Sequence, residues 1–127
     1  MTASELLESY QKSVRHLLLS QGQLQEVESW TGTGTDQARE KARQKVDLAS
    51  AATAAARDRI ITVIDSLPEL QAAVIQERYL HLGRFGHFQT WEEIAGSLCY
   101  GTDYIRHVHS KALKSIGTIL ETGTLDT

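Results

Sequence analysis

The chain has 127 residues, of which 41% are hydrophobic and 23% are charged, and its net charge at pH 7 is −3. These values are typical of one small globular domain, or of a domain with an extension, and they exclude a basic surface over the whole molecule. No apolar run approaches the roughly 20 residues of a membrane span. The polar N-terminus does not resemble a signal peptide, and the single cysteine, Cys99, excludes an internal disulfide. We therefore expect a cytoplasmic protein that does not enter membranes.

The first helix is predicted over residues 3–29. Its inward-facing positions recur at alternating spacings of three and four residues, as in a coiled coil. They are Leu7, Tyr10, Val14, Leu17, Gln21 and Leu24. The sequence WTGTGT, residues 30–35, then interrupts the helix. Because no Lys-Ser/Thr pair follows these glycines, we interpret the segment as a turn and not as a phosphate-binding loop.

A second long helix is predicted next, with Thr35 or Asp36 as its N-cap. Its inward-facing residues, which form an apolar seam along one side, continue the same spacing. They are Ala42, Val46, Ala49, Thr53, Ala56, Ile60, Val63 and Leu67. Two apolar seams of this length must be buried against a packing partner. The sequence leaves two partners possible for the second helix: the first helix folded back as an antiparallel hairpin, or a second copy of the chain in a homodimer. We assign residues 1–66 to this coiled-coil-like region, a candidate for oligomerisation or protein contact.

Pro68 marks the next helix start, because proline fits the first turn of a helix. The sequence SLPELQAAVIQERYL is predicted to bury four residues along one side, namely Leu70, Val74, Ile75 and Tyr79. Residues 81–89 contain two glycines and are predicted to form a loop, for which the sequence indicates no role.

Thr90 and Glu93 form a predicted capping box at the start of a helix that ends near Leu98. Tyr100 is expected to pack under a short turn, and a further helix is expected from Thr102. Counted from Trp91, the inward residues follow the helix-turn-helix pattern; they are Ile94, Ala95, Leu98, Ile105, Val108, Ala112, Leu113 and Ile116. Glycine is usual where Cys99 stands, since that backbone position often needs positive φ. Either Cys99 adopts this conformation or the turn is displaced towards Gly101.

The short turn between the helix that ends near Leu98 and the helix from Thr102 lets the second helix present its first turns to a DNA major groove. Residues 102–116 carry three cations and one anion, a local charge of +2. The candidate DNA-binding residues are Thr102, Asp103, Tyr104, Arg106, His107, Ser110, Lys111 and Lys114. Arg106 is suited to a guanine edge or a phosphate, and the two lysines, further along, to phosphates.

Two segments, SLPELQAAVIQERYL and TWEEIAGSLCYGTDYIRHVHSKALKSI, resemble region four of bacterial sigma factors. That region has a leucine-proline-glutamate helix start, an arginine-tyrosine helix end and a helix-turn-helix that finishes in lysine-alanine-leucine. The chain is more similar to the RinA/ArpU-like late-gene activators of phages of Gram-positive hosts. This resemblance rests on residues 91–95 and on Tyr104, Ile105, His109, Ala112 and Leu113. It covers about residues 60–117, and the N-terminal half resembles these proteins in layout only.

The resemblance implies a sequence-specific transcription regulator of a phage or prophage, with double-stranded DNA and bacterial RNA polymerase as partners. The expected fold is all-α, with a helical hairpin followed by a sigma region four-like helix-turn-helix over residues 67–120 and a flexible tail over residues 121–127. Two alternatives remain: a phage assembly protein such as a terminase small-subunit-like module, and a helical interaction domain that does not bind DNA. No enzyme motif is present, and we expect no cofactor and no metal, because His107 and His109 point about 200° apart on a helix.

Overall fold

The computed structural model describes residues 1–122, and these residues form helices and no strands, so the all-helical prediction is confirmed. Two long helices come first, α1 (Ala3–Glu28) and α2 (Thr35–Ile64). The shorter helices α3 (Glu69–Ile75) and α4 (Trp91–Leu98) precede the final α5 (Thr102–Glu121). A π-helical turn, η1 (Gln76–Leu80), prolongs α3, and a 3-10 turn, η2 (Arg84–Gly86), lies in the following loop.

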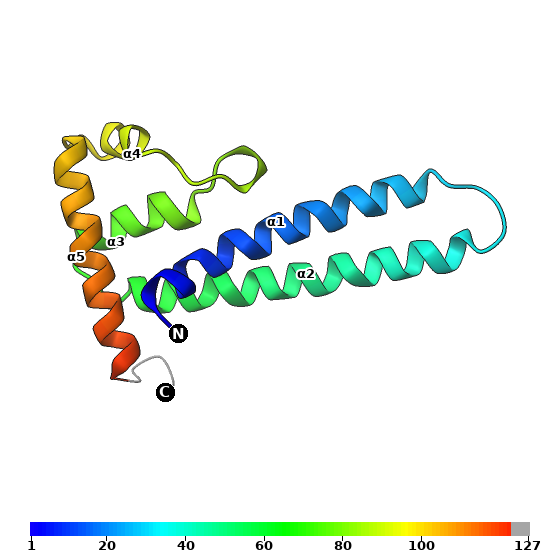
Figure 1. The fold of residues 1–127 in the computed structure, drawn as a ribbon, viewed down its shortest axis with the longest axis horizontal. Helices are drawn as coiled ribbons and strands as arrows, with labels where there is room; N and C mark the ends of the chain where they lie inside the picture. Colours follow the sequence, from blue (N-terminus) through cyan, green and yellow to red (C-terminus); the bar gives the residue numbers. More distant parts are fainter. Residues whose placement is uncertain (123–127) are drawn as a thin grey trace.

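Helices α1 and α2 lie side by side and antiparallel, and they extend well beyond the other helices (Figure 1). The alanine-rich seam of α2 therefore packs against α1 of the same chain. One seam position of α1 differs from the prediction, since Gln21 is exposed and Ser20 is buried instead. The small serine side chain can be covered completely at the contact, whereas the longer amide of Gln21 reaches solvent.

The ends of α2 also differ from the prediction. The N-cap is Gly34, in the left-handed region at φ 85°, and not Thr35 or Asp36. Thr35 is already helical, and its hydroxyl donates a hydrogen bond of 2.9 Å to the carbonyl of Gly32. The helix ends at Ile64 and does not reach Leu67, because proline disfavours helical backbone in the residue before it. Pro68 is itself the N-cap of α3, one position before the first turn.

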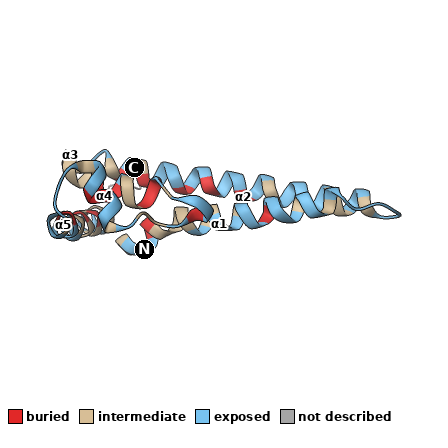
Figure 2. Ribbon diagram, turned by 90° about the horizontal axis from the view of Figure 1, so that it is seen from above, coloured by how far each residue is buried: buried red, intermediate tan, exposed pale blue. Residues whose placement is uncertain are grey.

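The main core joins the two ends of the chain. It contains Leu6 and Leu7 of α1, Ile60 of α2, Ile75 of α3 and Ile116 of α5, all with no exposed side-chain surface. Figure 2 shows that buried residues concentrate where these helices meet and become sparse towards the α1–α2 turn. This shared core fixes the position of α5 relative to the two long helices.

The loop between η1 and α4 packs back onto α1. The amide of Gln11 donates a hydrogen bond of 3.0 Å to the carbonyl of Gly86, and the guanidinium of Arg15 lies 3.2 Å from Nδ1 of His87. Gly86 has φ 75°, and a Cβ atom there would lie 3.2 Å from Cγ of Arg15. The loop thus closes onto α1, a contact that the sequence did not indicate.

Helix α5 includes Glu121, which the sequence had assigned to the tail. Residues 123–127 of that tail lie outside the described part of the chain.

Candidate nucleic-acid interface

Helix α4 begins with the predicted capping box. The Thr90 hydroxyl accepts a hydrogen bond of 3.1 Å from the backbone N–H of Glu93, and the Glu93 carboxylate accepts one of 3.2 Å from the N–H of Thr90. Two backbone donors that a helix start leaves unpaired are thereby satisfied. The presence of Glu93 at this position is therefore explained by its role in capping the helix.

The turn between α4 and α5 contains only three residues. Cys99 has φ 63° and ψ 40°, which is the left-handed conformation, so of the two alternatives left open the cysteine adopts the strained backbone and the turn is not displaced. Gly101 is the N-cap of α5 and offers no side-chain acceptor. The chain therefore reverses direction abruptly, and α5 begins immediately.

The inner side of α5 is anchored in a second apolar cluster. Ile105 and Val108 of α5 pack there with Val74 of α3 and with Ile94 and Ala95 of α4. The helix-turn-helix spacing placed the four residues of α4 and α5 inside, and the pattern of the preceding helix did so for Val74. Leu70 and Leu98, expected inside as well, are only half-buried at the edge of this cluster.

His109 anchors the back of α5. Its Nε2 atom lies 2.7 Å from the Tyr79 hydroxyl, and its ring lies 4.7 Å from that of Trp91. Burial, assisted by the positive charge of Arg78, lowers the pKa of His109 from 6.5 to about 4. The imidazole is therefore neutral at pH 7, so the Tyr79 hydroxyl can donate to Nε2. Burial also raises the pKa of Tyr79, which keeps this hydroxyl protonated.

Arg78 completes this support from η1. Its guanidinium lies 4.4 Å from the centre of the Trp91 ring and 5.0 Å from that of Phe88, and it donates a hydrogen bond to the carbonyl of Gln89. Cation–π contacts of this kind strengthen when water is excluded. Trp91 is thus a packing residue, and the tryptophan and histidine together hold α5 against η1 and α4.

The predicted DNA-binding residues lie on the outer side of the first four turns of α5, at one end of the molecule (Figure 1). Thr102 is half-buried, and the other seven are exposed; these are Asp103, Tyr104, Arg106, His107, Ser110, Lys111 and Lys114. We call these seven residues the α5 face. Within residues 1–122, the side chains of its three cations, Arg106, Lys111 and Lys114, have no hydrogen-bond or ion-pair partner. The +2 charge of this face therefore remains available to an external anion.

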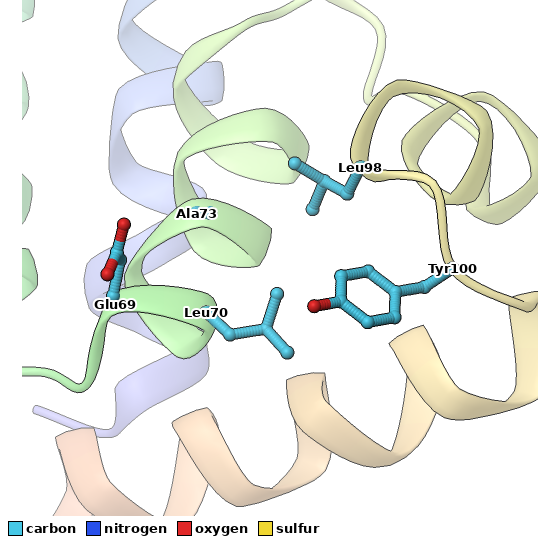
Figure 3. Close-up of a pocket in the computed structure, with 5 residues that line it drawn as sticks. All are labelled: Glu69, Leu70, Ala73, Leu98 and Tyr100. Carbon is cyan, nitrogen blue, oxygen red and sulfur yellow. The ribbon is translucent and has the colours of Figure 1, made fainter.

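Tyr100 was predicted wrongly. It is 48% exposed and does not pack under the turn. Its ring lies 5.3 Å from that of Tyr104, which is exposed to the same extent. Figure 3 shows Tyr100 pointing towards Leu70 across a pocket of about 420 Å³, with Leu98 beside them. A left-handed Cys99 redirects the chain and turns the tyrosine outward, a consequence that residue spacing alone did not reveal.

A second, smaller groove follows the flank of the α5 face. It has a volume of about 170 Å³ and lies between Pro68 and Gln71 on one side and Tyr104, His107 and Lys111 on the other. Tyr100 lines the first pocket and Tyr104 the second, and Leu70 lines both. Aromatic and polar groups thus lie along the flank of the α5 face.

No cluster of three metal-ligating side chains occurs in the described part of the chain. His109 faces inward and His107 faces outward, in agreement with their angular separation. Cys99 is exposed. None of the helices up to residue 122 combines the length and apolar character that crossing a membrane requires.

Comparisons of the chain with protein-family models, with curated proteins and with solved structures returned no match.

Proposed function

We propose that the chain is a sequence-specific DNA-binding regulator of transcription from a phage or prophage, and that α5 enters the major groove. The observation that supports this most is the α5 face, a hydrogen-bonding surface whose three cations have no side-chain partner within residues 1–122. It lies on a helix anchored from behind by Ile105, Val108 and His109. A helix is about 10–12 Å wide with its side chains, and the major groove is about 12 Å wide. The exposed side of α5 therefore fits this groove.

Five residues of the α5 face divide into two groups in this proposal. Arg106 is exposed in the second turn of α5 and reads a guanine edge, which can accept two hydrogen bonds from one guanidinium. His107 and Ser110 contact neighbouring base edges. Lys111 and Lys114 lie further from the helix start and contact phosphates, which position the protein without reading sequence.

The experiment is selection of bound sequences from a random duplex pool, followed by affinity measurements on the selected site. Arg106→Ala is expected to weaken binding by about 1–3 kcal/mol and to relax the preference at one base pair. Lys111→Ala is expected to weaken binding to all sequences alike. It should also reduce the slope of log affinity against log salt concentration by about one.

Arg43→Ala is the matched control, because it removes the same charge from an exposed position on α2, far from α5. It should leave DNA affinity unchanged. The proposal is refuted if no duplex is enriched at low salt, or if Arg106→Ala and Arg43→Ala have equal effects on affinity.

The resemblance to sigma region four adds RNA polymerase to the proposed partners. Co-purification of polymerase with the wild-type protein, but not in its absence, would support this part of the proposal. The proposed contact with polymerase is independent of the proposed DNA binding, and each can be refuted without the other.

A further inference from the structure

The loop between η1 and α4 contains a residue that the fold does not explain. Phe85, within η2, has φ 63° and ψ 20°, which is the left-handed region. A bulky side chain is rare in this region, whereas glycine adopts it without strain. The ring is also 67% exposed, and the guanidinium of Arg84 lies 5.1 Å from its centre. Strained backbone is concentrated at functional sites, so Phe85 is a candidate binding residue.

Two exposed leucines of α1 lie one turn beyond the point where this loop packs. The loop contacts the turn of α1 that contains Gln11 and Arg15, through the hydrogen bond of Gln11 and the close approach of Gly86 to Arg15. Leu18 and Leu19 follow Arg15 by three and four residues, which places them on the same side of α1. They are 43% and 61% exposed. Exposed apolar patches with a polar rim are typical of protein-binding surfaces.

The two segments that meet here contain no acidic residue. The chain has 16 acidic residues, yet none falls within residues 9–25 of α1 or within residues 78–91 around the loop. These segments instead provide three exposed cations, Lys12, Arg15 and Arg84, and none of the three forms an ion pair within residues 1–122. Packing of the loop onto α1 thus concentrates positive charge in a chain whose net charge is −3. We call the three cations, the two leucines and Phe85 the α1–loop surface.

We propose that the α1–loop surface binds an acidic, amphipathic segment of a partner protein. Apolar side chains of this segment cover Phe85, Leu18 and Leu19, and its carboxylates pair with the surrounding cations. Aromatic residues and arginine are enriched in protein interfaces, and complementary charge fixes the orientation of a partner. A helix with apolar residues three and four positions apart and acidic residues elsewhere has this chemistry. A nucleic-acid strand would pair with the cations and stack on Phe85, but it has no apolar side chains to cover the two leucines.

The α1–loop surface is separate from the proposed DNA interface. Figure 1 shows that the loop extends back along α1, whereas α5 lies at one end of the molecule. The inner side of α5 packs against α3 and α4 through Ile105 and Val108, and the α5 face is on its outer side. Because the two surfaces are formed by different elements, either proposal can fail without the other.

The probe is a fluorescein-labelled peptide of about 14 residues, or four helical turns, with leucine at every third or fourth position and glutamate or aspartate elsewhere. A comparison peptide has lysine in place of every acidic residue, and an oligothymidylate of equal length represents single-stranded nucleic acid. Affinity for the full chain is measured by fluorescence anisotropy. Amide chemical shifts of the isotopically labelled protein locate the binding site.

The acidic peptide is expected to bind at least about tenfold more tightly than the lysine peptide, because the cations of the surface repel lysine. Its largest chemical-shift changes should fall within residues 11–19 and 83–88. Phe85→Gly and Arg84→Glu are each expected to weaken binding by about tenfold or more, as for aromatic and arginine residues at the centre of an interface.

Trp30→Gly and Arg43→Glu are the matched controls. They make comparable changes at exposed positions in and near the α1–α2 turn, away from the loop, and should change affinity by less than about twofold. Arg106→Ala, on the α5 face, should also leave the affinity for the peptide unchanged. Thermal unfolding checks the role of Phe85, since Phe85→Gly removes a strained backbone and should leave Tm unchanged or raise it.

Several results would overturn the proposal. They are no binding of the acidic peptide at about 1 mM protein, equal affinity for the acidic and lysine peptides, and chemical-shift changes that concentrate on α5. Equal losses of affinity in the Phe85 and control variants would overturn it too. Tighter binding of the oligothymidylate with the same shift changes would assign the surface to nucleic acid instead. A Tm lowered by several degrees in Phe85→Gly would show that the ring stabilises the fold, which removes the reason for assigning it to binding.

Discussion

Replacement of Cys99 by glycine should stabilise the protein, although it removes a side chain. At φ 63° and ψ 40°, Cys99 has a left-handed backbone, which costs a non-glycine residue about 1–2 kcal/mol. Its thiol is exposed, so little packing is lost. Glycine gains about 0.5–1 kcal/mol of additional freedom in the unfolded chain. The net change is therefore an increase in unfolding free energy of about 0.5–1 kcal/mol, or a rise in Tm of about 2–4 °C.

The assay is urea and thermal unfolding followed by circular dichroism under reducing conditions. Cys99→Ala is the control, because it removes the thiol but keeps the unfavourable backbone, and its stability should remain within about 0.5 kcal/mol of the wild type. Cys99→Gly must be more stable than Cys99→Ala if the reasoning is right. If the glycine variant is equally stable or less stable, the left-handed turn is not strained in the way that the backbone angles indicate.

Three further predictions concern stability. Thr90→Ala removes the hydroxyl of the capping box and should lower the unfolding free energy by about 1 kcal/mol in urea, whereas Thr90→Ser should restore most of it. Gly86→Ala should destabilise by about 1–2 kcal/mol, because a Cβ atom would crowd Arg15 at a positive φ; wild-type stability would contradict this contact. Because the folded state holds the pKa of His109 near 4, below its ordinary 6.5, the unfolded chain binds a proton first and stability should fall as pH decreases from about 6.5 to 4. The expected loss is about 1–2 kcal/mol, reduced by the partial exposure of the ring, and His109→Gln should make urea unfolding less dependent on pH over this interval.

The sequence predicted features that depend on neighbouring residues. The capping box of Thr90 and Glu93 was predictable because its two partners are three residues apart and meet whenever a helix starts there. The buried positions of α2 and α5 follow from helical periodicity, which places residues three and four apart on one side. The exposed α5 face follows from the same periodicity, since it is the side opposite Ile105 and Val108.

Features that depend on contacts between distant residues were decided by tertiary structure. Periodicity identified an apolar seam on α2 but not the helix that buries it. Only the folded chain shows that α1 packs against one side of α2 while Leu48 remains exposed on another. The outward position of Tyr100 depends on the backbone angles of Cys99, which a residue name does not specify. The return of the η1–α4 loop to Gln11 joins residues 75 positions apart. Sequence patterns describe each helix as a separate object, whereas burial depends on which surfaces meet in space.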